Sequence, residues 1–165
     1  MSEPEVNRVL ILEDNPDDAE LVTKYLKKQG DYDFLFADDE DSFNQLVKEE
    51  KLDVVLADFS LPGFNALDAI KILHKIDSTI PLIVVTGTLE EADAVAVIKA
   101  GASDFITKDR LESLPASMLK AAQERKLLSF STRFQKYLDV IHRFDSNMLS
   151  EKPWEERREE GFQLI

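Results

Sequence analysis

The sequence contains no cysteine, and its other shortages also narrow the classes of protein that it can encode. Without cysteine, neither a disulfide framework nor a thiolate metal site can form. No run of about 18 apolar residues occurs, so we expect no transmembrane helix. The polar, acidic start (residues 1–7) lacks the pattern of a secretory signal. These absences lead us to expect a cytoplasmic protein without membrane contact.

Basic residues and glycines are scarce as well. Twenty lysines and arginines stand against 33 aspartates and glutamates, giving a net charge of −13. This charge argues against direct nucleic-acid binding, which needs clustered basic residues, and fits a divalent cation as a partner. Only 5 glycines occur, and no glycine-rich turn follows the first apolar run, so a dinucleotide-binding domain is excluded.

What the sequence does contain is typical of one globular domain with an appendage. The chain has 165 residues, of which 44% are hydrophobic and 32% charged. Its central stretch is a buried-strand pattern at residues 54–57, followed by Asp58 and by a turn signal at residues 61–63. Ligands of open α/β sheets bind beyond the carboxyl ends of strands, so Asp58 is placed for chemistry. The alternative is that Asp58 only ends the strand or caps the next helix.

Five short apolar runs alternate with helical patterns along the chain. The runs cover residues 8–12, 34–37, 54–57, 82–85 and 103–107, and the helical patterns cover 16–29, 41–50, 67–73, 89–100 and the region from 114 onward. Asn15 is suited to cap the first helix and Pro16 to begin it, while Gly30 and Gly101 are expected stops. Such alternation predicts a doubly wound α/β fold with a five-stranded parallel sheet of order 2-1-3-4-5.

This strand order brings several polar side chains to one edge of the sheet. Glu13 and Asp14 follow the first strand, Asp58 the third, Thr86 the fourth and Lys108 the fifth. Two carboxylates about 4 Å apart repel by roughly 4 kcal/mol at an effective dielectric constant near 20, so such a cluster favours a bound cation, and oxygen ligands suit Mg2+. These groups are the parts that phosphoryl transfer requires. Taken singly, the two acids fit a solvated helix start, the threonine a turn and the lysine a surface charge.

Together these motifs resemble the receiver (CheY-like) domain of two-component response regulators. The resemblance rests on ILEDNP at 11–16, DFSLPG at 58–63, VTG at 85–87 and KAGASDFITK at 99–108. It covers residues 6–125 and implies a flavodoxin-like fold. It also implies a signalling switch that catalyses only its own phosphoryl transfer and dephosphorylation.

The resemblance implies a role for each motif residue. Asp58 would accept a phosphoryl group from a histidine kinase or phosphotransfer protein. Mg2+ would be held by Glu13, Asp14, Asp58 and the backbone carbonyl of Ser60. Thr86 would follow the phosphoryl group and Lys108 would pair with it, while Phe105 would change rotamer. Ser60 and Thr88 would tune the lifetime of the phosphoryl group.

The signal would be read on the face formed by helix 89–100, strand 104–107 and the last helix. In helix 89–100, Ala96 and Val97 are less polar than a free surface needs, which indicates an interface. One departure from the family pattern is Asp109, which follows Lys108 where many receivers have proline. The cis bond that precedes that proline is therefore not expected, because a cis bond before another residue costs about 3 kcal/mol.

The last helix continues past the end of the receiver pattern. Apolar residues recur at spacings of three and four, at positions 127, 130, 134, 137, 141, 144 and 148. This heptad pattern predicts a helical extension over 126–150 that forms a coiled coil with a second copy of the chain. A homodimer could also form through the readout face, and the bulky aromatics could instead pack on the receiver or on a missing domain. Residues 151–165 fit a linker or the start of a missing output domain.

Two other functions compete with the switch. A haloacid dehalogenase-type phosphatase also uses an aspartate at a strand end, but it needs a second aspartate two residues later, where this chain has Ser60. A degenerate receiver could bind proteins without being phosphorylated, but such modules usually lack part of the acidic cluster, which is complete here.

Overall fold

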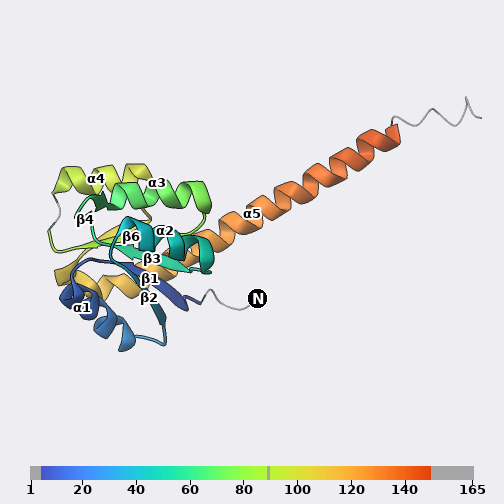
Figure 1. Ribbon diagram of the computed structural model, residues 1–165. Helices are drawn as coiled ribbons and strands as arrows, with labels where there is room; N and C mark the ends of the chain where they lie inside the picture. The colour runs from blue at the N-terminus through green and yellow to red at the C-terminus, as the bar shows by residue number, and fades with distance from the viewer. Residues whose placement is uncertain (1–4, 89, 150–165) are drawn as a thin grey trace, which may run out of the picture. The chain divides into compact units, whose positions relative to one another are not determined.

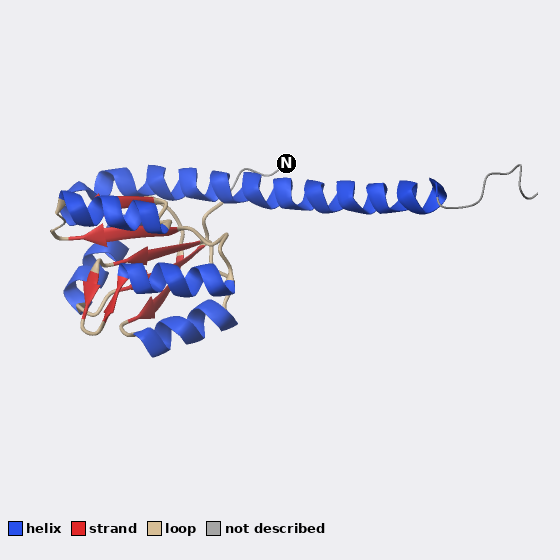
Figure 2. Cartoon of the chain, turned by 90° about the horizontal axis from the view of Figure 1, so that it is seen from above, coloured by secondary structure: helices blue, strands red, loops and turns tan. Residues whose placement is uncertain are grey.

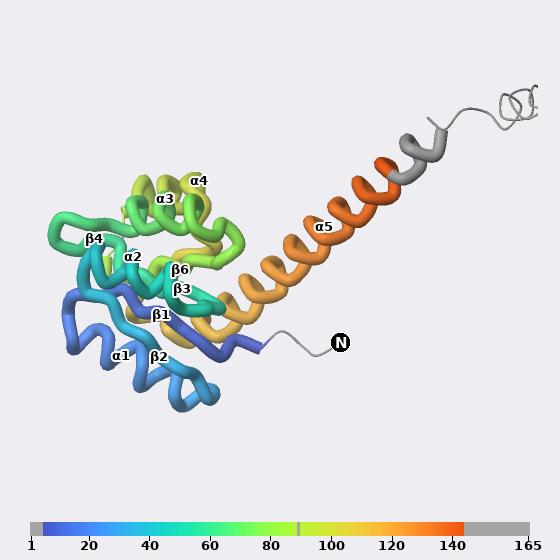
Figure 3. Tube along the Cα trace, turned by 45° about the vertical axis from the view of Figure 1, so that its right-hand side comes forward, coloured from blue at the N-terminus to red at the C-terminus, as the bar shows by residue number. Residues whose placement is uncertain are grey.

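Five parallel strands form the central sheet of this computed structural model, which describes residues 5–88 and 90–149 and the side chains up to residue 143. In spatial order they are β2 (Asp33–Ala37), β1 (Arg8–Leu12), β3 (Val54–Ala57), β6 (Leu82–Thr86) and β7 (Asp104–Thr107). Every neighbouring pair runs parallel, and β1 lies between β2 and β3 (Figures 1 and 3). Counted within this sheet, the order is the predicted 2-1-3-4-5, so the predicted fold class is confirmed.

Helices follow the strands as predicted. They are α1 (Pro16–Lys27), α2 (Glu40–Glu49), α3 (Ala66–Ile76), α4 (Glu91–Ala100) and α5 (Leu114–Leu149), with a short 3-10 helix η1 (Lys108–Ser113) before α5. The side chain of Asn15 caps α1 by accepting a hydrogen bond from the N–H of Asp17. The helix ends at Lys27, before the predicted Gln29, because the following N–H groups bond back in a tighter 3-10 turn.

The strands are buried on both faces, and their side chains alternate between two core clusters. In β1, the odd-numbered residues belong to one cluster and the even-numbered residues to the other. Leu10 faces α2, α3 and α4, and Val9 faces α1 and α5. Figure 2 shows the strands between these helical layers. This double burial explains why each strand reads as a continuous apolar run.

Two features of the fold differ from the sequence-based prediction. A small antiparallel hairpin, β4 (Ser60–Leu61) and β5 (Phe64–Asn65), follows β3, where only a turn was predicted. Its Gly63 has φ +71°, a conformation that other residues rarely adopt. On α4, Val97 is buried in the core, so it does not belong to a surface as predicted, whereas Ala96 is partly exposed and Val95 and Ile98 are exposed.

The chain divides into two units, the first ending at Leu127 and the second beginning at Leu128. Within the first unit, Arg125 of α5 donates a hydrogen bond to the backbone oxygen of Leu52 (2.6 Å) and pairs with Asp77. The predicted linker at 151–165 lies outside the described residues. Among the described residues, no helix combines the length and the apolar composition needed to cross a bilayer.

Candidate functional site

The carboxyl ends of β1 and β3 are joined by backbone hydrogen bonds that bring three acidic residues together. The N–H of Asp58 donates to the carbonyl of Leu12 (2.9 Å), which sets Asp58 beside the start of the β1–α1 loop. Glu13, Asp14 and Asp58 each offer a carboxylate oxygen, and these oxygens lie within 4.8 Å of one another. The acidic cluster that the strand order predicts is therefore present.

Lys108 lies against this cluster and partly balances its charge. Its Nζ atom is 2.8 Å from Oε2 of Glu13 and 3.6 Å from Oδ2 of Asp58. The Glu13 contact is a hydrogen bond, whereas the Asp58 contact is too long for one and acts through charge alone. The ammonium group is thus on the same rim as the carboxylates, as the sequence predicted.

A fourth carboxylate, which the sequence reasoning missed, also binds Lys108. Oδ2 of Asp18, in the first turn of α1, accepts a hydrogen bond from Nζ at 2.8 Å. The acidic first turn of α1 was visible in the sequence, but no local pattern shows which of Asp17 and Asp18 points toward a lysine 90 residues away.

Burial and charge shift the ionisation of two of these groups. Burial raises the pKa of Glu13, and hydrogen bonds from Lys108 and from the N–H of Asn15 only partly oppose this shift. Burial would lower the pKa of Lys108, but the hydrogen bonds to Asp18 and Glu13 and the charge of Asp58 raise it above its usual value. Lys108 is therefore held firmly as a cation.

The remaining predicted residues surround the same cleft or its neighbour. Ser60, Thr86 and Thr88 line the cleft that contains Asp58 and Lys108. The hydroxyl of Thr86, a buried residue, donates to the backbone oxygen of Thr88 at 3.2 Å. Phe105 does not line this cleft. This residue is 38% exposed, and it borders an adjacent hollow that shares Gly87 and Thr88 with the cleft.

The loop geometry around the site follows from two local structures. The hairpin begins at Ser60, two residues beyond Asp58. In this hairpin Ser60 pairs with Asn65. After β7 the chain enters η1 directly at Lys108, and no cis peptide bond occurs among the described residues, so the Lys108–Asp109 bond is trans.

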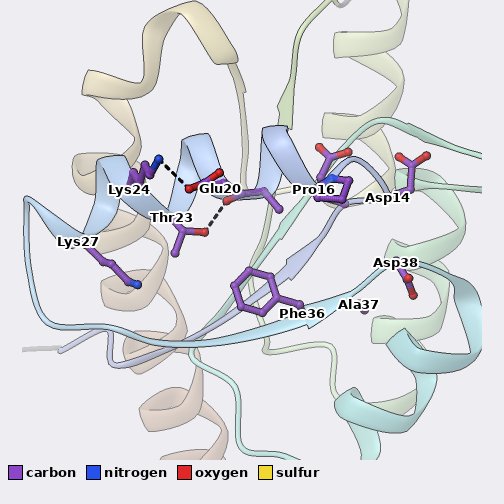
Figure 4. A pocket seen from close by; sticks show the side chains of 11 residues that line it. Asp14, Pro16, Glu20, Thr23, Lys24, Lys27, Phe36, Ala37 and Asp38 are labelled. Carbon is purple, nitrogen blue, oxygen red and sulfur yellow. Dashed lines mark hydrogen bonds and ion pairs between the residues drawn. The ribbon is translucent and has the colours of Figure 1, made fainter.

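A second hollow opens between α1 and β2 (Figure 4). Asp14 and Asp38 lie at one end of it and Lys24 and Lys27 at the other, with the Phe36 ring between them. Asp14 lines this hollow, whereas Asp58 lines the cleft that contains Lys108.

A doubly wound sheet with carboxylates at its switch point and a lysine at the carboxyl end of the edge strand β7 is the arrangement expected of the receiver class of signalling domains. The comparison with protein families gives the same result. The model described as "Response regulator receiver domain" matches residues 9–118, more than half of the chain, and the chain belongs to this family. The resemblance noted in the sequence is thereby confirmed.

Curated relatives differ in how much of their own length the match covers. Protein PilH of Pseudomonas aeruginosa is 38% identical over 103 residues, which cover 61% of this chain and 84% of PilH. DNA-binding response regulator MtrA of Mycobacterium tuberculosis is 33% identical over 101 residues, which cover 61% of this chain and 43% of MtrA. The match thus spans less than half of the length of MtrA.

Solved structures with the same fold include a response regulator of Burkholderia pseudomallei. It is 25% identical to this chain, with a TM-score of 0.61, and the alignment covers 74% of this chain and 72% of that one. That crystal structure contains a phosphorylated aspartic acid, a calcium ion and citrate.

Proposed function

We propose that this domain is a phosphorylation-dependent switch in which Asp58 accepts a phosphoryl group from a histidine kinase or phosphotransfer protein. The observation that carries the proposal is the grouping of Asp58 with Glu13 and Asp14, oxygens within 4.8 Å, beside the Lys108 ammonium. The phosphorylated aspartic acid of the Burkholderia pseudomallei regulator supports it by similarity.

The transfer is a displacement at phosphorus. A carboxylate oxygen of Asp58 attacks the phosphorus of a protonated phosphohistidine, the new O–P bond forms and the P–N bond breaks. The nitrogen keeps the electron pair, and the donor leaves as neutral imidazole. Later attack by water releases inorganic phosphate and restores the carboxylate. The domain catalyses only these two steps on itself.

The donor set fits a divalent cation, and we propose Mg2+. Carboxylate oxygens of Glu13, Asp14 and Asp58, with the Ser60 backbone carbonyl, would form an all-oxygen site that leaves room for water and a phosphoryl oxygen. When bound, the cation neutralises charge on the carboxylates and on the phosphoryl oxygens. Lys108 offsets only part of the repulsion, because its single positive charge lies beside three carboxylates, those of Glu13, Asp18 and Asp58.

Phosphorylation adds negative charge and acceptor oxygens at Asp58, and Thr86 and Lys108 are hydrogen-bond donors that line the same cleft. We propose that Thr86 leaves the Thr88 carbonyl to bind the phosphoryl group and that Phe105 rotates inward. Shifting a two-state balance from about 1:99 to 99:1 takes roughly 5.5 kcal/mol. A few charge-assisted hydrogen bonds of about 1.5–3 kcal/mol each are sufficient. Ser60 and Thr88, at the cleft rim, would tune how long the phosphoryl group persists.

The change would be read on the surface of α4, β7 and α5. Exposed apolar side chains gather on these elements, namely Val95, Ile98, Phe105 and Leu119. Such a set is suited to a protein partner. The net charge of −13 does not favour direct contact of this region with nucleic acid, and the DNA binding named for MtrA belongs to a protein of which more than half is unmatched.

Phosphorylation of the purified chain is the direct test. Incubation with acetyl phosphate and Mg2+ is expected to add one phosphate-sized increment to the intact mass, and excess EDTA is expected to prevent it. Peptide mapping should place the increment on the segment containing Asp58. Steady turnover of small phosphomonoesters would instead support the phosphatase alternative, and the absence of any increment would support a degenerate receiver.

We propose that the distal part of α5, over the predicted extension 126–150, pairs with a second copy of the chain. Its heptad positions carry apolar side chains that are exposed in the single chain as far as side chains are described, namely Leu127, Phe130, Phe134, Tyr137 and Ile141. The side chains of the last two positions, 144 and 148, lie outside that range. A seam of this kind is self-complementary between two helices.

Light scattering at tens of micromolar tests the pairing. The wild-type chain is expected to have the mass of a dimer, and Phe134→Glu to have that of a monomer, because two carboxylates would enter the apolar seam. Thr132→Glu adds the same charge two residues away, off the seam, and should remain dimeric. A wild-type monomer, with and without phosphorylation, would contradict the pairing and favour packing on the receiver or a further domain.

A further inference from the structure

The proposed role of Lys108 leaves one of its contacts without a function. An ammonium group has three N–H donors. Two of them are used by Glu13 and Asp18, each at 2.8 Å, whereas Asp58 is 3.6 Å away. The third donor is left for a phosphoryl oxygen on Asp58, but the two hydrogen-bonded carboxylates hold the ammonium group in place and oppose its movement toward that oxygen.

The two acceptors differ in how easily they can release the ammonium group. The Glu13 side chain is 5% exposed, so little water can reach it to replace the hydrogen bond from Lys108. The Asp18 side chain is 37% exposed, so water can replace the lost hydrogen bond. Asp18 also lines the same cleft as Asp58 and Lys108. Asp18 is accordingly the acceptor that can be exchanged.

From this geometry we infer that Asp18 is a positioning residue that holds Lys108 in the unphosphorylated domain and competes with the phosphoryl group for it. The inference rests on the proposed function, because it requires a phosphoryl group on Asp58. Release of Asp18 would also free the first turn of α1 from the start of η1, so this contact links phosphorylation to α1.

Binding of beryllofluoride, a non-covalent mimic of the phosphoryl group, measures the competition without any turnover. With saturating Mg2+ and fluorine NMR detection, Asp18→Asn is expected to bind beryllofluoride about threefold to fivefold more tightly than wild type, the scale of a partly exposed ion pair. Asp18→Glu, which keeps the charge, should restore affinity toward that of wild type.

Two controls separate this competition from a general change of charge. Asp17→Asn removes the same charge from the same helical turn, but Asp17 is exposed and is not among the ion-pair partners of Lys108 in the described chain, so its effect should stay below twofold. In a Lys108→Ala background, Asp18→Asn should have no effect beyond that of Asp17→Asn.

The outcomes distinguish the inference from the function on which it rests. If wild type binds beryllofluoride but Asp18→Asn matches Asp17→Asn, or weakens binding, the competition is refuted and the switch stands. If wild type neither binds beryllofluoride nor gains phosphate, the proposed function itself has failed.

Discussion

Asp58→Asn is expected to abolish the phosphate-sized mass gain that acetyl phosphate and Mg2+ produce in wild type. The carboxamide is close to isosteric with the carboxylate, but it is neutral and is a poor nucleophile toward phosphorus. It also removes one of the three charges that would hold the cation. The measurement is intact mass after matched incubation, with circular dichroism to show that the variant is folded.

The control for this variant is another aspartate near the same lysine. Asp109 follows Lys108, is exposed and does not belong to the acidic cluster. Asp109→Asn should therefore gain phosphate as wild type does. An undiminished mass gain in Asp58→Asn, or a phosphate mapped to another residue, would remove Asp58 from its proposed role.

Phe43→Ala is expected to lower the free energy of unfolding by about 3–5 kcal/mol, the range for emptying a phenylalanine site in a packed core. Phe43 on α2 is 0% exposed, and its ring centroid lies 5.7 Å from that of Phe64 in the hairpin after Asp58. Truncation removes a contact between the core and the hairpin that begins at Ser60. Urea unfolding at equilibrium measures the loss, which should appear as a lower midpoint with little change in slope.

Phe36→Ala is the matched comparison, since Phe36 on edge strand β2 is 53% exposed. Its loss should cost less than about 1 kcal/mol, because the ring already contacts water over much of its surface. If both truncations lowered the free energy of unfolding equally, the core between the sheet and helices α2, α3 and α4 would not contribute the stability expected of it.

Most of the fold could be predicted from local patterns. Strands buried on both faces produce uninterrupted apolar runs, and residues such as Asn15 and Gly101 mark helix ends through their own backbone chemistry. Because parallel strands place their carboxyl ends at one edge, the strand order was sufficient to group Glu13, Asp14 and Asp58. Neither inference needs a contact between distant side chains.

Other features depended on tertiary contacts that no local pattern encodes. The apolar residues of α4 occur all around the helix, so only packing shows that Val97 faces inward and that Val95 and Ile98 do not. The strands β4 and β5 have two residues each, too few for a periodic signal.

Lys108 shows most clearly what the sequence predicts and what only tertiary packing decides. Its place at the end of a strand follows from the sequence, but its binding to Asp18 depends on how α1 lies against the start of η1. Backbone hydrogen bonding and the alternation of side chains act over a few residues and can be read along the chain. Whether Asp17 or Asp18 binds Lys108 depends on which carboxylate lies near the ammonium group. Lys108 is 90 residues from Asp18 in the chain, and only the folded domain brings the two together.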